Sequence, residues 1–329
     1  MKNKYRLLSI SGSYWTGSSA LIDLLQEHRD CLIVPEEFAV FSYGQFFKEV
    51  YAPISKNQTL NDEQFSNLLR MLKFNESEPR LVFSAARYVC RLLGIFPKGI
   101  FEKRMGMNRL LGKRYSKSCL ELYKYLEHSK NNLSNTEIPT IKKLIKNVLI
   151  QAANYGRNVA TEKPEGSELI VFDQLIAPPY TNYALPAIPD LRLLHVNRDW
   201  KDQYVDIRHR LGPMLKIHSH LGLKPYGETL RMQKLKPIDF FIELIKFTHE
   251  IRMDHINQRK ENIMWIDFED IVLETSRTAS NVFDFLNLDP KFWSPNTVFR
   301  PEMSKNNIGQ WKSTPWQDEI KYIEEKLQT

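Results

Sequence analysis

A short segment of small residues near the N-terminus is the part of the sequence best suited to hold an anion. It reads Gly12-Ser13-Tyr14-Trp15-Thr16-Gly17-Ser18-Ser19 and follows a predicted strand, Tyr5–Ile10. A helix is predicted directly after it, because Leu21, Leu24 and Leu25 recur at helical spacing. A loop in this position directs backbone N–H groups and the positive end of a helix dipole at one point, which suits a phosphate or sulfate group. The alternative is an ordinary turn between a strand and a helix.

The spacing of this loop imitates the nucleotide P-loop, G-x-x-x-x-G-K-[ST], but Ser18 stands where the lysine is expected. Without that lysine, a kinase or ATPase lacks the cation that binds the β- and γ-phosphates. A serine hydroxyl instead suits a ligand with a single 5′-phosphate that carries a group of lower charge. A P-loop-like nucleotide kinase remains an alternative, which Ser18 disfavours.

A second candidate site follows the predicted strand Leu191–Val196. The strand leads into Asn197-Arg198-Asp199-Trp200-Lys201-Asp202-Gln203-Tyr204. Open α/β sheets bind ligands in the loops that leave the carboxyl ends of their parallel strands. Arg198 can contact a phosphate there through two hydrogen bonds, although a solvated charged loop would look the same.

A third candidate segment lies near the C-terminus, at Ser304-Lys305-Asn306-Asn307-Ile308-Gly309-Gln310-Trp311-Lys312. It combines two lysines, a glycine and a tryptophan in a polar loop. Such a loop can close over a nucleotide, with lysine on phosphate and tryptophan beside the base. Its alternative is a surface linker to the last helix.

Together, these three segments resemble the motifs of sulfotransferases that use 3′-phosphoadenosine 5′-phosphosulfate (PAPS), and they follow the family's order along the chain. The resemblance, closest to the carbohydrate sulfotransferases of bacterial type, implies that Arg198 contacts the 3′-phosphate. It also implies that Phe268-Glu269-Asp270 matches the family's structural Y-E-D-L segment. The donor-binding residues that it implies in the first and third segments are Gly12, Thr16, Gly17, Ser18, Ser19, Lys305, Gly309, Trp311 and Lys312.

Three positions of these segments depart from the family pattern. Trp15 stands where the family usually has a lysine or arginine, Asp206 replaces a serine that contacts the 3′-phosphate, and Asn306 replaces a glycine. We count Trp15 and Asp206 among the donor-site positions all the same. We expect neighbouring cations to compensate, and the candidates are Lys163, Arg208, Arg210 and Lys305.

The candidate catalytic base is a glutamate just after the second predicted strand, Cys31–Val34. Pro35 is expected to end that strand, so that Glu36 and Glu37 lie at the ligand edge of the sheet. Several carbohydrate sulfotransferases place a catalytic glutamate in this region. A carboxylate there can take the proton of an acceptor hydroxyl as its oxygen attacks sulfur. We expect Glu37 to be the base and Glu36 to be second choice; the alternative is that both begin a helix, where acidic residues favour the dipole.

The fold that must position these residues is predicted to be α/β, with a P-loop-like parallel sheet flanked by helices. Strands at Leu169–Phe172 and Ile263–Ile266 join the three above, with a long helix from Ile238 to about Lys260 between the last two. A capping box at Thr314, Pro315 and Gln317 is predicted to open the final helix. We expect one domain over residues 1–329, with a mainly helical insertion over about 40–165 that forms the acceptor site.

The net charge of +7 is concentrated in Arg87–Lys124, which has ten basic residues and two acidic ones. Such a segment favours an anionic partner. We expect PAPS as co-substrate and an acidic or membrane-presented glycan as acceptor, with peripheral membrane contact through Arg87–Lys124. A non-catalytic basic module that binds nucleic acid or lipid is the alternative; on the enzyme interpretation we expect no nucleic acid partner.

The rest of the composition favours a cytoplasmic protein. No signal peptide and no apolar run long enough to span a membrane is visible. The three cysteines (Cys31, Cys90 and Cys119) are isolated, which fits a reducing compartment, and only His218 and His220 are closely spaced histidines. We therefore expect no metal site.

Overall fold

The computed structural model describes residues 5–13, 15–38, 41, 44–62, 112–129, 137–159, 169–211 and 235–328. Most of the basic segment Arg87–Lys124 therefore lies outside the described residues, as do Lys163, His218 and His220. No helix in the described ranges is both long and apolar enough to cross a membrane.

A five-stranded parallel sheet forms the centre of the molecule, with the strand order β2-β3-β1-β4-β5. The α/β fold class predicted from the sequence is therefore confirmed. Each predicted strand is present, and each runs one to three residues beyond its predicted end: β1 Arg6–Gly12, β2 Cys31–Glu37, β3 Leu169–Asp173, β4 Leu191–Asn197 and β5 Ile263–Asp267.

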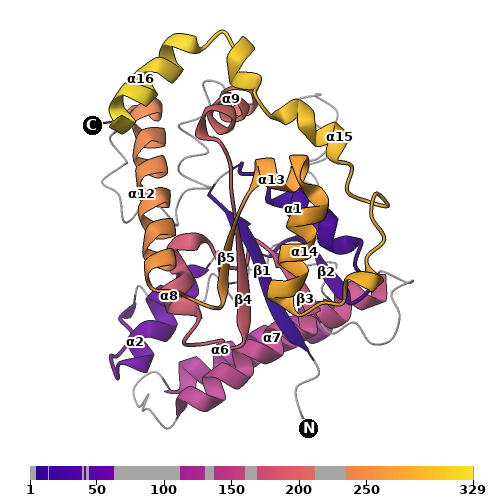
Figure 1. Cartoon of the computed structure of the whole chain (residues 1–329). Helices are drawn as coiled ribbons and strands as arrows, with labels where there is room; N and C mark the ends of the chain where they lie inside the picture. The colour runs from indigo at the N-terminus through magenta and orange to yellow at the C-terminus, as the bar shows by residue number, and fades with distance from the viewer. Residues whose placement is uncertain are drawn as a thin grey trace, which may run out of the picture.

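Helices cover both faces of this sheet (Figure 1). Among the described residues the α-helices are α1 Ser18–Gln26, α2 Ala52–Ser55, α6 Gly112–Ser129, α7 Ile138–Val159, α8 Thr181–Ala184, α9 Trp200–Leu211, α12 Pro237–Asn257, α13 Phe268–Leu273, α14 Thr275–Leu286, α15 Pro301–Ser304 and α16 Gln317–Gln328. Within the predicted insertion, the described part consists mostly of helix, in α2, α6 and α7 and in a π-helical turn, Phe47–Tyr51.

The strands are apolar in almost every position because both of their faces are buried. Side chains alternate between faces along a strand, so Leu7 of β1 packs with α6, α7 and α8 on one face. Its neighbour Leu8 packs with α1, α13 and α14 on the other. A third cluster joins α9, α12 and α16 beyond one edge of the sheet.

Strand β2 does not end at Pro35, as the sequence analysis predicted, but continues to Glu37. Because β2 is an edge strand, Pro35 does not need to donate a hydrogen bond to a neighbour on its open side. The pairing of β2 with β3 shifts register between Ile33 and Glu37, and Glu37 is then level with Asp173. The sheet therefore extends to the glutamate pair rather than stopping before it.

The predicted capping box of the last helix is also wrong. Helix α16 begins at Gln317, the residue predicted to be its third. The Thr314 hydroxyl accepts a hydrogen bond from the backbone N–H of Trp316 at 3.5 Å, and the Gln317 side chain donates to the carbonyl of Trp311 at 2.5 Å instead of returning to Thr314. The chain uses both residues to tie the preceding turn to the helix.

Two histidines are buried beside the central strands. His195 of β4 is fully buried and lies within hydrogen-bond distance of Ser11 (Nδ1 to Oγ, 2.9 Å) and Thr181 (Nε2 to Oγ1, 3.2 Å). His255 of α12 accepts a hydrogen bond at Nδ1 from the indole N–H of Trp265 at 3.3 Å. Burial lowers the pKa of His195 well below 6.5 and, with the charge of Lys260, lowers that of His255 to about 4.

These buried histidines predict a loss of stability in mild acid. Between pH 6.5 and about 4 the unfolded chain protonates His255 while the folded chain does not, so the free energy of unfolding should fall over that window. His255→Asn keeps an acceptor for Trp265 but cannot titrate. Urea unfolding from pH 7 to 4 should therefore show a smaller decrease for His255→Asn than for the wild type.

The control is His249→Asn, which changes an exposed histidine of the same helix. It should show the wild-type dependence on pH. If the free energy of unfolding falls equally with decreasing pH in His255→Asn and His249→Asn, burial of a neutral His255 does not cause the loss of stability.

Candidate functional site

The guanidinium of Arg198 joins all three segments that the sequence analysis selected. It donates to the carbonyl of Trp15 in the loop after β1 (3.3 Å) and to the carbonyl of Asn307 in the C-terminal loop (2.7 Å). Arg198 itself follows β4, and it also donates to Asp206 of α9 at 2.5 Å. Segments that are more than 100 residues apart therefore meet at one side chain.

Arg198 is almost completely buried, with a side chain 3% exposed. Its guanidinium carbon lies 5.1 Å from the ring centre of Phe268, the first residue of α13. Its Nε–H has no hydrogen-bond partner among the described residues. A buried N–H without an acceptor is costly, and a ligand oxygen would remove that cost.

The loop after β1 is packed so tightly that two of its positions require glycine. A Cβ on Gly12 would collide with the Thr16 side chain and would lie 2.7 Å from the Val196 carbonyl oxygen. Gly17 has φ +82°, and a Cβ there would lie 2.5 Å from the Phe268 ring. Gly17 and Phe268 therefore hold the start of α1 against the start of α13, which is a structural role for the first residue of Phe268-Glu269-Asp270.

Neighbouring elements fix this loop from its other side. The Ser13 carbonyl accepts a hydrogen bond from the Gln203 side chain of α9, and the Ser13 hydroxyl accepts one from Thr248 of α12 at 3.0 Å. The Gln174 side chain, just beyond β3, donates to the Ser18 hydroxyl at 3.0 Å. The loop is therefore held from three elements before any ligand arrives.

Backbone donors of the loop remain available for an anion. Among the described residues, none accepts a hydrogen bond from the backbone N–H of Thr16, Gly17, Ser18 or Ser19. The first amides of a helix have no acceptor within the helix, and their dipoles attract negative charge. These N–H groups are the donors that the sequence analysis assigned to a phosphate or sulfate, and the binding of an anion there stays a prediction.

The C-terminal loop is held in place by Asp202, which is 1% exposed. The two oxygens of this carboxylate accept hydrogen bonds from the backbone N–H groups of Gly309 (2.7 Å) and Trp311 (3.1 Å). Gly309 has φ +76°, so the turn favours glycine. Asp202 and Asp206 are four residues apart on one face of α9, and each binds one part of the site.

The expected compensating cations are only partly available. Arg208 forms a bidentate pair with Glu319 of α16 (3.0 and 3.1 Å), so it is already engaged. Lys305 and Lys312 are exposed. Trp15, in the place of the usual cation, has φ 53° and packs beside the α9–α12–α16 cluster. Lys163 and the Arg210 side chain lie outside the described residues.

A polar cavity of about 670 Å³ opens next to Arg198, between the loop after β1, the ends of β4 and β5, and α12. On its wall Arg252 makes a bidentate pair with Asp267 (2.9 and 3.1 Å). Burial would raise the pKa of Asp267, but hydrogen bonds from Arg252 and Asn197 outweigh it and hold the pKa below its usual value. Burial raises the pKa of Glu269, whose carboxylate accepts a hydrogen bond from the backbone N–H of Asp199.

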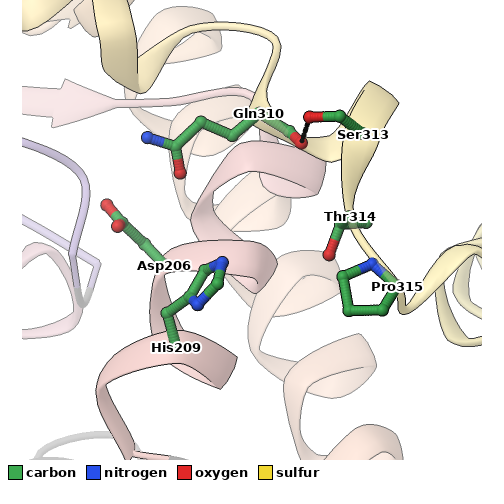
Figure 2. A pocket seen from close by; sticks show the side chains of 6 residues that line it. All are labelled: Asp206, His209, Gln310, Ser313, Thr314 and Pro315. Carbon is green, nitrogen blue, oxygen red and sulfur yellow. Dashed lines mark hydrogen bonds between the residues drawn. The ribbon is translucent and has the colours of Figure 1, made fainter.

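A second cavity, of about 570 Å³, is lined in part by Asp206. Figure 2 shows Asp206 and His209 of α9 across from a short segment that comprises the end of the C-terminal loop and the residues after it. That segment contributes Gln310, Ser313, Thr314 and Pro315.

The structure places the backbone of Glu36 and Glu37 at the carboxyl end of β2. The backbone N–H of the next residue, Phe38, donates to the Asp173 carbonyl at 2.7 Å. The side chains of Glu36 and Glu37 lie outside the described part of the structure. Their place at this edge agrees with the expectation, while their role stays a prediction.

Sequence reasoning missed the residues that organise the site without being part of a recognisable pattern. Asp202 and Gln203 stand inside the motif around Arg198, but no feature of their spacing singled them out. Gln174 follows a strand, which is the only signal that could have indicated it.

No protein-family model matches the chain, and no curated protein does. Among solved structures, the chain is similar to a sulfotransferase domain from the curacin biosynthetic pathway, at 13% identity and a TM-score of 0.45, covering 98% of this chain and 97% of that one. Another is a sulfotransferase domain of the Synechococcus PCC 7002 olefin synthase (12%, TM-score 0.42, covering 98% and 95%).

A third is sulfotransferase STF9 from Mycobacterium avium, at 11% identity and a TM-score of 0.38, covering 93% of this chain and 69% of that one. All three have low identity and low structural scores. None of these similarities assigns the chain to a family.

Asp202 provides a direct test of how the site is assembled. Asp202→Ala removes the acceptor of two backbone N–H groups, and hydrogen bonds to a charged group contribute about 1.5–3 kcal/mol each. Hydrogen exchange, followed by mass spectrometry, should therefore become faster in the peptide containing Gly309 and Trp311. Glu302→Gln, an exposed change in the adjacent α15, should leave that exchange unchanged. Unchanged exchange in the Asp202 variant would show that the loop is held by other contacts.

Proposed function

We propose that this protein transfers the sulfuryl group of PAPS to a hydroxyl group of an acceptor. The observation that carries the proposal is the meeting of the three motif segments at Arg198, which donates to the carbonyls of Trp15 and Asn307. The alternatives for the three segments were an ordinary turn, a solvated loop and a surface linker. None of these alternatives would require the segments to meet at one buried side chain. Their convergence at the carboxyl edge of the sheet is what a nucleotide site requires.

The loop after β1 fits the 5′-phosphosulfate of this donor. It offers the backbone N–H groups of Thr16, Gly17, Ser18 and Ser19, and a serine hydroxyl in place of the P-loop lysine. These groups would stabilise the negative charge that develops on the leaving phosphate. A nucleoside triphosphate would place more negative charge at a loop that has no lysine to meet it.

In the proposed reaction the acceptor oxygen attacks sulfur while the bond between sulfur and the bridging phosphate oxygen breaks. The electron pair of that bond stays with the phosphate, which leaves as adenosine 3′,5′-bisphosphate. The acceptor proton passes to the carboxylate of Glu37, at the edge where β2 ends. Correct positioning of the reactants and electrostatic stabilisation of the transition state would accelerate this step, as they do in phosphoryl transfer.

For the acceptor we propose an acidic glycan, or a glycan presented at an anionic membrane surface, in contact with the insertion at about 40–165. The support for this acceptor is the charge of Arg87–Lys124, which has ten basic residues and only two acidic ones. The same charges support peripheral attachment to a membrane from the cytoplasmic side.

The proposal predicts that adenosine 3′,5′-bisphosphate binds much more tightly than ATP. ATP has no 3′-phosphate for Arg198, and the loop has Ser18 where a triphosphate needs lysine. Isothermal titration calorimetry of the full chain with both nucleotides measures this preference. Equal affinity for the two nucleotides would contradict the proposed donor.

Glu37 is tested by an isosteric change. Glu37→Gln should bind adenosine 3′,5′-bisphosphate as the wild type does, but its kcat should fall by roughly 10²–10⁴-fold because the proton acceptor is lost. Glu36→Gln is the matched control and should retain most of its activity. If Glu36→Gln is the inactive variant, the base is the neighbouring residue; if both are active, the base is elsewhere.

A further inference from the structure

The carboxylate of Asp206 forms an ion pair with the guanidinium of Arg198. The proposed function assigns that same guanidinium to the donor's 3′-phosphate. We propose that Asp206 is a built-in competitor for that phosphate: it leaves Arg198 when the donor binds and returns when the nucleotide product departs. The proposal rests on the proposed function and adds a means by which the chain limits its own affinity for the product.

The ion pair is close and largely shielded from water. Asp206 Oδ2 lies 2.5 Å from Nη1 of Arg198, and the two side chains are 15% and 3% exposed. A phosphate that binds the same guanidinium would bring two further negative charges next to this carboxylate. Like charges repel strongly at short range away from bulk water. The carboxylate and the phosphate would therefore repel each other if both bound Arg198, and the binding of each would be weaker.

Arg198 can keep its position when Asp206 leaves. Its Nη1 and Nη2 atoms also donate to the carbonyls of Trp15 and Asn307, and neither bond involves Asp206. In addition, its Nε–H lacks an acceptor among the described residues, and a phosphate oxygen is a suitable one. The guanidinium is therefore held in place but incompletely hydrogen-bonded.

Asp206 also has space into which it can move. Asp206 lines the cavity of about 570 Å³ between α9 and the segment Gln310–Pro315. In Figure 2 the carboxylate of Asp206 points away from Thr314 and Pro315, which line the far side of this cavity. A rotation of the side chain into the cavity would break the ion pair without a shift of α9.

A competitor of this kind has a kinetic consequence. It weakens the binding of donor and product alike, but product release benefits because the returning carboxylate replaces the departing phosphate. Removing the charge of Asp206 should therefore tighten binding of the bisphosphate and slow its release.

The experiment compares two nucleotides that differ only at the 3′ position. Adenosine 3′,5′-bisphosphate and adenosine 5′-monophosphate are titrated by calorimetry into the wild type, Asp206→Asn and Asp206→Ser. The Asp206 variants should bind the bisphosphate roughly 10–100-fold more tightly, as expected when one nearby like charge is removed, and the monophosphate as the wild type does.

Asp190→Asn is the matched control, because it removes the same charge at the opposite end of β4, where Asp190 pairs with Lys146. It should bind both nucleotides as the wild type does. Thermal unfolding of each variant, and the use of serine as well as asparagine at 206, separate an effect on binding from an effect on folding.

The outcomes are distinguishable. If the wild type binds the bisphosphate and both folded Asp206 variants bind it equally or more weakly, Asp206 is not a competitor, while the proposed function stands. If the variants bind both nucleotides more tightly by the same factor, the effect does not concern the 3′-phosphate and the proposal is wrong. If neither the wild type nor any folded variant binds the bisphosphate, the proposed function and this inference both fail.

Discussion

The buried guanidinium of Arg198 is the interaction on which the site depends. A charged side chain that is only 3% exposed needs compensating groups. The chain supplies three: the Trp15 carbonyl, the Asn307 carbonyl and the Asp206 carboxylate. Because each partner belongs to a different segment, satisfying one side chain fixes the relative position of all three. The loss of one partner with no other acceptor in its place would leave a buried charge short of hydrogen bonds, which is costly.

The parallel sheet makes this arrangement possible. The carboxyl ends of β1 and β4 are neighbours in the sheet, so the loop after β1 and the residue after β4 start close together. The C-terminal segment is brought to the same place by Asp202, whose carboxylate binds the backbone of Gly309 and Trp311. In Figure 1, α9, α13 and α15 gather at this end of the sheet, away from the labelled N-terminus.

Much of this could be predicted from the sequence, for physical reasons. Strands buried on both faces must be apolar throughout, so their positions were visible as short runs such as Leu191–Val196. The loop after β1 was visible because close packing of Gly12 and Gly17 excludes larger residues. Arg198 was visible because a strand end is where a ligand-binding charge is expected.

Other features depend on contacts between distant residues, which a single sequence does not reveal. That Asp206 pairs with Arg198 depends on the direction in which α9 leaves β4. That β2 continues through Pro35 depends on its place at the edge of the sheet, where a missing N–H is tolerated. The predicted capping box needs the Gln317 side-chain oxygen to accept from the Thr314 N–H, whereas in the structure the Gln317 side-chain amide donates to the Trp311 carbonyl. In each case tertiary geometry overrode a valid local pattern.

The central claim is that the three segments joined by Arg198 form a donor site for sulfuryl transfer. Its most direct test is to incubate the full chain with PAPS carrying ³⁵S and with a panel of neutral, acidic and membrane-presented glycans, and to follow both products. We predict that label appears on an acceptor and that adenosine 3′,5′-bisphosphate is released in equal amount, only when that acceptor is present. Failure to transfer label to any acceptor, together with transfer of the γ-phosphate from ATP under the same conditions, would contradict it.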